Sequence, residues 1–524
     1  MTSRNHSSFY IGGKWLPAQS DAVFDVVSPR TEERIGSVPA ASPADIDAAV
    51  AAARHAFDET DWSRRPHAER GELCARLATA IAERSGELAE LFTEETGSPI
   101  MLSRVYQAVA PSVSLNYYAR LASRYRFEEV RESDLSSLAG GSSGGSIIPF
   151  GGKSLVVQEP VGVVAAFTAY NFALACFAQK SAPALVAGCT VVVKVPEQNP
   201  LSSFVLAELA DEAGFPSGVL NFVAAGPAAA EHLVRHPGVD MVSFTGSTAV
   251  GRRIGEICGG QIKRAVLELG GKSASIICPD ADLELAIPTL VGCSVGTNQG
   301  QSCVAMSRIL APAGRYAEIA DRFAELICGL KVGDPTEPDT VVGPLISAAH
   351  RDRVEGYIAK GIAEGANVRT GGGRPAHLPR GWYVEPTLLT DVRNDMTVAR
   401  EEVFGPVAVL IGYHDEEEAI RIANDTSFGL AGTVFTADVM HGFAIARRIR
   451  AGTFSVNTYV CDLNSPFGGN KQSGIGREDG VDGLMEYLQP KTISVDPAQE
   501  LPAEILATTP RTRWPEEGPE ESRA

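Results

Sequence analysis

The run Val161-Gly-Val-Val-Ala-Ala-Phe167 is the first of five short apolar segments that decide the fold. The other four segments cover residues 190–194, 220–223, 241–244 and 265–269. Each segment is apolar throughout, and spacers long enough for a helix separate them, which is typical of a parallel sheet buried on both faces. Ligands of such sheets bind at the carboxyl ends of the strands. The sequence therefore predicts an α/β unit over residues 160–277.

The chain upstream of this unit predicts a strand pair followed by helices. Phe9-Tyr-Ile-Gly-Gly-Lys-Trp-Leu16 has the pattern of two short strands turned by its two glycines. Ser42-Pro43-Ala-Asp45 supplies an N-cap, a proline at the first helical position and an acid at the third. We therefore expect a helix up to about Phe57. Three more helices are expected, at residues 67–83, 85–95 and 102–124.

Residues 127–158 change in character, from a charged stretch through a Gly/Ser run to the extended Lys153-Ser-Leu-Val-Val-Gln158. This composition predicts a hairpin whose loop tip is flexible. A two-stranded hairpin buries too little surface to be stable alone, so we expect it to pair with another subunit.

The second half of the chain predicts another α/β set over residues 271–457, with strands at 407–412, 433–435 and 454–457. Beyond it, residues 497–524 are rich in proline and acid. Such a segment is expected to be disordered because it cannot bury enough apolar surface to offset its conformational entropy.

Length, charge and cysteine usage exclude several classes of protein. A chain of 524 residues is too long for one core. Its net charge of -18 argues against nucleic acids and anionic membranes as partners. No apolar run approaches the ~18 residues of a membrane span, and the first eight residues lack a signal-peptide core. Nine scattered cysteines predict free thiols in a reducing cytoplasm. A metal site is not expected, because the sequence has no Cys/His cluster.

Two segments after predicted strands suit a nucleotide. Lys194-Val-Pro-Glu197 could hold a ribose between a cation and a carboxylate, although a surface ion pair explains the spacing equally well. Gly246-Ser247-Thr offers backbone N–H groups and a hydroxyl at a helix N-terminus, where a pyrophosphate binds well.

Two further strand ends carry groups suited to catalysis. Glu268 ends an apolar strand beside Gly270 and Gly271, where partial desolvation would raise its pKa and suit a general base. A glutamate facing solvent is the alternative. Asn171 follows the first strand, and its amide could donate to a developing oxyanion or cap a helix.

Cys303 follows Asn298-Gln-Gly-Gln-Ser302, a run of small and amide residues that favours an exposed nucleophile over a helix interior. A buried, inert cysteine is the alternative. Taken together, Asn171, Lys194/Glu197, Gly246-Ser247, Glu268 and Cys303 resemble, in order and approximate spacing, the motifs of the aldehyde dehydrogenase superfamily. Glu401-Glu-Val-Phe404-Gly-Pro406 and Ser465-Pro-Phe-Gly-Gly469 extend the resemblance, which covers roughly residues 8–495.

The resemblance implies two Rossmann-like α/β domains and a small β arm for oligomerisation. The dinucleotide-binding domain would comprise residues 1–129 and 159–270, the catalytic domain residues 271–484, and the arm residues 130–158 and 485–496. It also implies a homodimer or homotetramer.

The resemblance also implies the roles of the site residues. Cys303 would be the nucleophile, Asn171 with the Cys303 N–H the oxyanion hole, and Glu268 the base that activates water. NAD would be held by Thr168, Lys194, Glu197, Gly226, Phe244, Gly246, Ser247, Leu269, Gly270, Glu402 and Phe404. The Glu197 carboxylate would repel a 2′-phosphate, but Lys194 beside it leaves NADP use open.

The expected reaction is oxidation of an aldehyde to the acid through a thioester on Cys303, which water then hydrolyses. Release of the thioester to coenzyme A is a less favoured alternative, because it needs no base such as Glu268. A non-catalytic cofactor-binding protein and a cysteine hydrolase are the others; the hydrolase would need a histidine near Cys303, and none lies closer in sequence than His350 and His236.

Three residues depart from the family pattern: Tyr170 replaces a tryptophan, Asn470 a tyrosine, and His350 a glutamine whose loss is expected to loosen a cofactor contact. The substrate is the least determined part. Ala173, Ala175 and Cys176 would line a tunnel and leave room for a bulky apolar aldehyde, with Val304 as an apolar wall and Gln179 as one polar contact.

Overall fold

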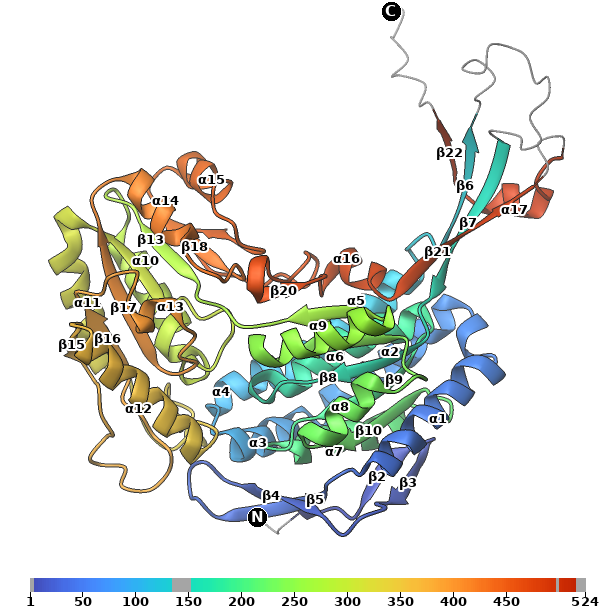
Figure 1. Cartoon of the computed structure of the whole chain (residues 1–524), viewed down its shortest axis with the longest axis horizontal. Coiled ribbons are helices and arrows are strands. Elements are labelled where there is room, and N and C mark those ends of the chain that lie inside the picture. The colour runs from blue at the N-terminus through green and yellow to red at the C-terminus, as the bar shows by residue number, and fades with distance from the viewer. Residues whose placement is uncertain (1–3, 134–151, 496–498, 515–524) are drawn as a thin grey trace, which may run out of the picture.

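The structure, a computed structural model, describes residues 4–133, 152–495 and 499–514 (Figure 1). Its largest sheet has eight strands in the order β20-β12-β11-β8-β9-β10-β2-β3. The five central strands are parallel, and the three flanking strands are antiparallel to their neighbours. The strands are β2 (Ser8–Ile11), β3 (Lys14–Pro17), β8 (Val163–Phe167), β9 (Thr190–Val195), β10 (Leu220–Ala224), β11 (Met241–Thr245), β12 (Arg264–Glu268) and β20 (Gly474–Ile475). All five predicted apolar strands are confirmed.

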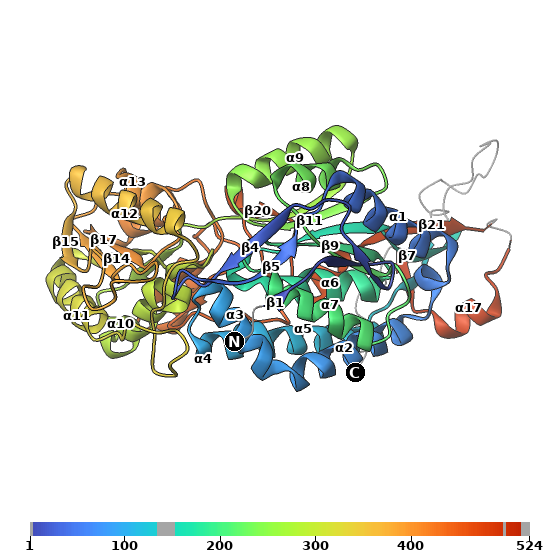
Figure 2. The same ribbon diagram turned by 90° about the horizontal axis from the view of Figure 1, so that it is seen from below.

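Helices cover both faces of this sheet. Figure 2 shows α1, α8 and α9 on one side, and α2, α5, α6 and α7 on the other. They are α1 (Pro43–Glu59), α2 (His67–Glu83), α3 (Ser85–Thr96), α5 (Ala110–Ala122), α6 (Ala173–Ala187), α7 (Pro200–Glu212), α8 (Pro227–Arg235) and α9 (Thr248–Gln261). The predicted start of α1 is confirmed, because Ser42 and Asp45 form a reciprocal capping box. The turn between β2 and β3 is also as predicted, with positive φ at Gly12 and Gly13.

The helix expected at residues 102–124 is interrupted. It consists of α4 (Ile100–Ser103), a π-helical turn η2 (Arg104–Val109) and α5. Pro111 lacks the N–H that would continue regular α-helical bonding into α5, and the extra residue of a π turn rotates side chains relative to an α-helix. The turn places Gln107 fully inside the protein, where it bonds the Asn171 carbonyl and the Leu174 N–H at 3.4 and 3.2 Å.

The second sheet has seven strands in the order β15-β16-β17-β14-β13-β18-β19. Apolar clusters pack on both of its faces, one with α12 and α14 and the other with α10 and α11. The strands are β13 (Ala274–Ile277), β14 (Arg308–Pro312), β15 (Asn367–Thr370), β16 (Thr387–Thr390), β17 (Val407–Tyr413), β18 (Gly432–Phe435) and β19 (Ser455–Val456). The helices are α10 (Leu283–Val291), α11 (Tyr316–Cys328), α12 (Ala348–Ala363), α13 (Thr397–Arg400), α14 (Glu416–Asn424), α15 (Val439–Ala446) and α16 (Gly480–Met485). The strands predicted in this half are confirmed.

Two smaller sheets complete the fold. One joins β1 (Arg4–Asn5), β5 (Arg34–Pro39) and β4 (Val23–Val27).

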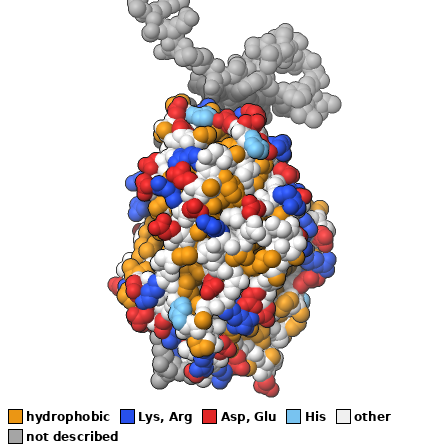
Figure 3. Space-filling model, turned by 90° about the vertical axis from the view of Figure 1, so that its left-hand side faces the viewer, with side chains coloured by type: hydrophobic (Ala, Val, Ile, Leu, Met, Phe, Trp, Pro, Cys, Tyr) orange, Lys and Arg blue, Asp and Glu red, His pale blue; other side chains and the backbone are white. Residues whose placement is uncertain are grey.

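On the face of the seven-stranded lobe seen in Figure 3, positive and negative side chains are interspersed, with apolar atoms between them.

The other small sheet forms an arm that projects from the body (Figure 1). Its order is β21-β7-β6-β22, with β6 (Glu128–Ser133), β7 (Gly152–Pro160), β21 (Leu488–Ser494) and β22 (Arg511–Trp514). The predicted hairpin of β6 and β7 is confirmed, and its loop tip lies outside the described residues.

The prediction of a disordered tail from residue 497 is wrong for residues 499–514. This segment forms α17 (Ala503–Thr508) and then β22, which pairs with β6. Composition missed this order because the pairing uses backbone groups and the packing needs few apolar residues, among them the buried Leu501. Residues 515–524 lie outside the described part of the chain.

Candidate functional site

A cavity of about 670 Å³ lies at the carboxyl edge of the eight-stranded sheet. Its walls come from the segments after β8, β9, β11 and β12 and from α8 and α9. The other lobe contributes Cys303, His350, Arg353, Glu402 and Phe404. Twelve of the fourteen predicted site residues line it: Thr168, Asn171, Lys194, Glu197, Phe244, Gly246, Ser247, Leu269, Gly270, Cys303, Glu402 and Phe404. The other two, Gly226 and Glu268, are not part of its lining.

Strand register explains why residues so far apart in sequence meet here. Phe167 pairs with Lys194 on one side and with Phe244 on the other, and Thr245 pairs with Glu268. Parallel strands of similar length thus end at one edge, which brings the residues that follow them together.

Two helices begin at this edge. Ser247 is the N-cap of α9, and its hydroxyl accepts a 3.4 Å bond from the Val250 N–H. Gly226 occupies the corresponding position of α8, where the neighbouring Pro227 lines the cavity. The first N–H groups of a helix carry partial positive charge, so the start of α9 can receive a phosphate group.

Lys194 and Glu197 form an ion pair of 3.0 Å inside the cavity wall. Their side chains are 13% and 31% exposed, so both reach the cavity from a largely covered position. A ribose contact and an ion pair are therefore compatible interpretations of Lys194 and Glu197, because the ion pair itself faces the cavity.

The loop before Cys303 has an unusual backbone. Asn298, Gln299 and Gly300 all have positive φ, at 49°, 55° and 68°. A Cβ on Gly300 would lie 2.0 Å from the Gly405 carbonyl oxygen, so only glycine fits. The Asn298 amide donates to the Asn171 carbonyl at 3.2 Å, which holds the loop against the end of β8. The amide residues in this run thus fix the loop.

Asn171 lies beside the nucleophile loop. Its Nδ2 donates to the Gln301 carbonyl at 3.0 Å, two residues before Cys303. The N-cap position of α6 is Phe172, so the alternative of Asn171 as a helix cap is wrong. A buried amide held this close to the loop can donate a second hydrogen bond into the cavity.

Cys303 is partly exposed and lines the cavity. Burial of the sulfur raises the pKa of the Cys303 thiol well above its usual value, and the carboxylates of Glu402 and Glu268 raise it further. All nine cysteines are free, and five of them are buried. The alternative of Cys303 as an inert core residue is not supported by its position.

Glu268 is 3% exposed, and neither carboxylate oxygen has a hydrogen-bond partner among the described residues. Its carboxyl group lies against Gly468, where an added Cβ would be 2.5 Å from Oε1. Burial raises its pKa well above the usual range, and the neighbouring Glu478 adds to this. The alternative of a solvent-facing glutamate is wrong.

A buried ion pair that the sequence did not predict lies beside Glu268. Lys180 Nζ contacts Glu478 Oε1, and both side chains are almost fully buried. Next to this pair, Gln179 donates to Asp479 at 3.0 Å, and burial raises the pKa of Asp479 to about 7. A lysine in the largely apolar α6 was the available signal. Gln179 bonds Asp479 through one amide hydrogen, and its contact with a substrate stays a prediction.

The far wall of the cavity is built around Glu402. Glu402 Oε1 accepts from the Gly271 N–H at 2.9 Å, and burial raises its pKa to about 7. His350 Nε2 lies 2.6 Å from the Phe404 carbonyl oxygen, so this nitrogen carries the proton. The rings of Tyr170, His350 and Phe404 pack edge to face at 6.0–6.4 Å. Tyr170 and His350, which both depart from the family pattern, therefore pack against each other.

The sequence model of the aldehyde dehydrogenase family matches residues 15–493. The chain belongs to the aldehyde dehydrogenase family. It is 44% identical over 489 residues to geranial dehydrogenase from Castellaniella defragrans, a match that spans 93% of this chain and 98% of the relative. It is 37% identical to betaine aldehyde dehydrogenase 1 from Rhizobium meliloti, over 94% of this chain and 98% of that protein.

Solved structures of other aldehyde dehydrogenases have the same fold. An aldehyde dehydrogenase from Mycobacterium tuberculosis in complex with NAD+ has a TM-score of 0.90 and 43% identity, covering 95% of this chain and 100% of that one. A cysteine-to-alanine variant of aldehyde dehydrogenase C from Pseudomonas syringae, in complex with NAD+ and octanal, has a TM-score of 0.88 and 38% identity, covering 94% and 98%.

In this family member the third departure, Asn470, accepts a 2.9 Å bond from Arg477. Arg353, which lines the cavity, was not predicted from the sequence.

In residues 4–133, 152–495 and 499–514, no three His, Cys, Asp or Glu side chains gather as a metal site. Of the helices within the same residues, none is both long and apolar enough to cross a membrane.

Proposed function

We propose that this aldehyde dehydrogenase oxidises an apolar aldehyde to the carboxylic acid with NAD+, through a thioester on Cys303. The observation that carries this proposal is the cavity itself. A cysteine, an amide donor and a helix N-terminus with a nearby Lys/Glu pair line one space of about 670 Å³, which is within the range of cofactor pockets.

The cavity residues fit a dinucleotide. The start of α9, with Ser247, would receive the pyrophosphate, and the Lys194/Glu197 pair would receive a ribose. Glu402 and Phe404 would hold the riboside at the other end, with Thr168, Phe244, Gly246, Leu269 and Gly270 as walls. An added Cβ at Gly270 would lie 2.5 Å from Glu402 Oε2, so a glycine here leaves room for the Glu402 carboxylate. Gly226 would act through the start of α8.

The cofactor preference follows from Glu197. Its carboxylate would accept from a free 2′-hydroxyl and repel a 2′-phosphate. Because Lys194 neutralises part of that charge at 3.0 Å, we propose a preference for NAD rather than strict exclusion of NADP.

Cys303 would attack the aldehyde as a thiolate, after its thiol proton passes to water in the cavity. The Cys303 sulfur bonds to the carbonyl carbon, and the carbonyl oxygen takes the electron pair. The Asn171 amide and the Cys303 N–H would stabilise that oxyanion. Bound NAD+ would supply the hydride acceptor. As the oxyanion re-forms the carbonyl, the hydride leaves and Cys303 carries a thioester.

Glu268 would then activate water. It takes a proton from a water molecule, the oxygen attacks the thioester carbonyl, and the Cys303 sulfur leaves with the acid as product. A raised pKa suits this task because the carboxyl group can take and release a proton near neutral pH. An unpaired base next to the nucleophile favours hydrolysis over release to coenzyme A.

The substrate we propose is a bulky apolar aldehyde. Tyr106 packs at 5.7 Å against Phe172, the residue after Asn171, and Val304, the residue after Cys303, packs against the apolar cluster of the second lobe. Apolar side chains therefore adjoin both the amide donor and the nucleophile. The relatives named for geranial and crystallised with octanal support this class. Ala173, Ala175 and Cys176 do not line the described cavity, so their role in a tunnel stays a prediction.

We also propose a homodimer or homotetramer in the cytoplasm. The arm projects from the body, and β21, at its edge, is exposed along almost its whole length. An exposed edge strand favours pairing with another chain.

Nine free cysteines suit a reducing compartment. The division into the domains 1–129 with 159–270, 271–484, and the arm 130–158 with 485–496 stays part of this proposal.

NADH formation over a panel of aldehydes tests the function. We expect octanal and branched terpenoid aldehydes to give a higher kcat/KM than acetaldehyde. Cys303→Ala should lower turnover at least ~1,000-fold because the covalent route is lost. Cys328→Ala, at an exposed thiol away from the cavity, should leave turnover unchanged. A preference for acetaldehyde would refute the substrate class, and unimpaired turnover in Cys303→Ala would refute the mechanism.

A further inference from the structure

The chain continues beyond the part that it shares with its family. The family match ends at residue 493, whereas the sequence runs to residue 524. The described part of this extension, residues 499–514, lies on the arm (Figure 1). Its contacts are therefore additions to the shared fold.

The extension pairs with the outer strand of the arm hairpin. β22 runs parallel to β6, with Arg511 opposite Val130 and Arg513 opposite Glu132. The Val130 N–H donates to the Pro510 carbonyl at 2.8 Å just before the strand begins. The backbone groups of β6 thus gain partners from the same chain.

The extension also covers apolar side chains of the arm. Val130, Leu155 and Leu501 are buried together in a small cluster, separate from the cores of the two lobes. Val495, Ile505 and Leu506 pack against this cluster. Lys153 and Glu500 form an ion pair between β7 and the extension. Without residues 499–514, the face of the arm around Val130 and Leu155 would lose most of this cover.

The two edges of the arm sheet therefore differ. β21 forms one edge, and its residues after Leu488 are exposed. β6 would form the other edge, but β22 occupies it. An open edge of a sheet presents free N–H and C=O groups, which pair readily with a strand of another chain.

We propose that residues 499–514 are an edge cap that occupies β6 and excludes a second copy of this chain from that edge. The cap leaves β21 as the open edge and so limits assembly to one side of the arm. A second copy is the competitor that fits the site, because its own arm offers the same exposed strand edge and the same apolar cluster.

Removal of the cap tests this proposal. A chain ending at Val495 is compared with the full chain and with a control that ends at Trp514 and keeps the cap. Mass is measured by light scattering after gel filtration over a 100-fold range of concentration. We expect the full chain and the control to have one mass. The chain ending at Val495 should form species of at least twice that mass, increasingly so with concentration.

Point variants of the full chain separate loss of the cap from loss of folding. Thr512→Pro removes a backbone donor in the middle of β22, and Leu501→Asp places a charge in the buried cluster. Both should raise the mass as truncation does, whereas Thr512→Val should not. Hydrogen exchange at the Val130 amide should become at least 10-fold faster in Thr512→Pro.

Two results would overturn the proposal. An unchanged mass in both the truncated chain and the point variants would show that the β6 edge attracts no second copy. A smaller mass would show that the extension joins subunits instead of keeping them apart. Catalytic activity does not enter either result.

Discussion

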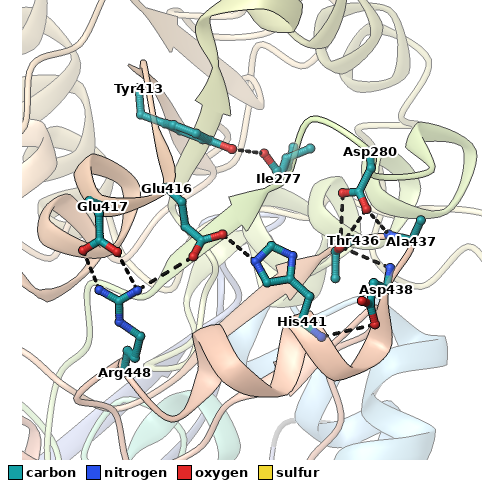
Figure 4. A network of polar contacts seen from close by, with 10 residues as sticks. All are labelled: Ile277, Asp280, Tyr413, Glu416, Glu417, Thr436, Ala437, Asp438, His441 and Arg448. Atoms are coloured by element: carbon teal, nitrogen blue, oxygen red, sulfur yellow. Dashed lines mark hydrogen bonds and ion pairs between the residues drawn. The ribbon is translucent and has the colours of Figure 1, made fainter.

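Two polar regions of the molecule differ in whether their charged groups have hydrogen-bond or ion-pair partners. At the corner of α14 and α15 every charged group in Figure 4 has a partner: His441 bonds Glu416, and Arg448 bonds Glu417 at 2.7 Å. Asp280 accepts from the Thr436 hydroxyl and the Ala437 N–H. The ion-paired side chains here are about 40% exposed or more.

The region formed by Cys303 on the cavity wall and Glu268 outside the cavity lining has the reverse arrangement. Glu268 is nearly fully buried and has no hydrogen-bond partner among the described residues, and the pKa of the Cys303 thiol is raised by burial and nearby carboxylates. Exposed pairs contribute only about 0.2–1 kcal/mol each, whereas a buried polar group without a partner costs roughly 1–3 kcal/mol. Groups kept at that cost are candidates for chemistry, and paired surface groups are candidates for structure.

The largest effect should come from changing Glu268, a buried group without a hydrogen-bond partner among the described residues. Glu268→Gln keeps the shape of the side chain but removes the base, so turnover should fall ~100-fold or more. The first burst of NADH should remain, because hydride transfer precedes the step that needs Glu268. Stopped-flow absorbance measures both. Steady-state turnover like that of the unaltered enzyme would show that Glu268 is not the base.

A smaller effect should come from Glu197, a paired group on the cavity wall. Glu197→Ala removes the repulsion of a 2′-phosphate and leaves Lys194 unpaired, so the ratio of kcat/KM for NAD over NADP should fall by roughly 10-fold, or ~1.4 kcal/mol. Steady-state kinetics with both cofactors measures this ratio. Gln198→Ala, at the next cavity residue, is the matched control. An unaltered enzyme that used NADP as well as NAD, or better, would contradict the account.

The smallest effect should come from the fully paired corner. Arg448→Ala removes the contacts with Glu417 and Glu416, and we expect the free energy of unfolding to fall by only about 0.5–1 kcal/mol. Denaturant unfolding measures the loss, and kcat should not change. A fall in kcat with unchanged stability would mean that paired surface groups also serve the reaction.

Much of the fold was predictable because its signals are local. Five apolar runs predicted β8 to β12, and the Ser42/Asp45 pattern predicted the start of α1. Twelve of the fourteen predicted site residues line one cavity because parallel strands bring their ends to one edge.

What the sequence could not predict depends on contacts between distant residues. The buried ion pair of Lys180 and Glu478 joins residues 298 positions apart, so no local pattern reveals it. The π turn at Gln107 depends on groups near Asn171 that only the fold brings close. The order of residues 499–514 depends on the free edge of β6, which is a property of the folded arm.

The central claim is that Cys303 carries the acyl group and Glu268 releases it. Glu268→Gln enzyme, mixed with NAD+ and octanal and quenched in acid within seconds, is analysed by intact mass and peptide mapping. The account predicts one octanoyl group per chain, on the peptide that contains Cys303. An unmodified chain after a full burst of NADH, or an acyl group on another cysteine, would contradict it.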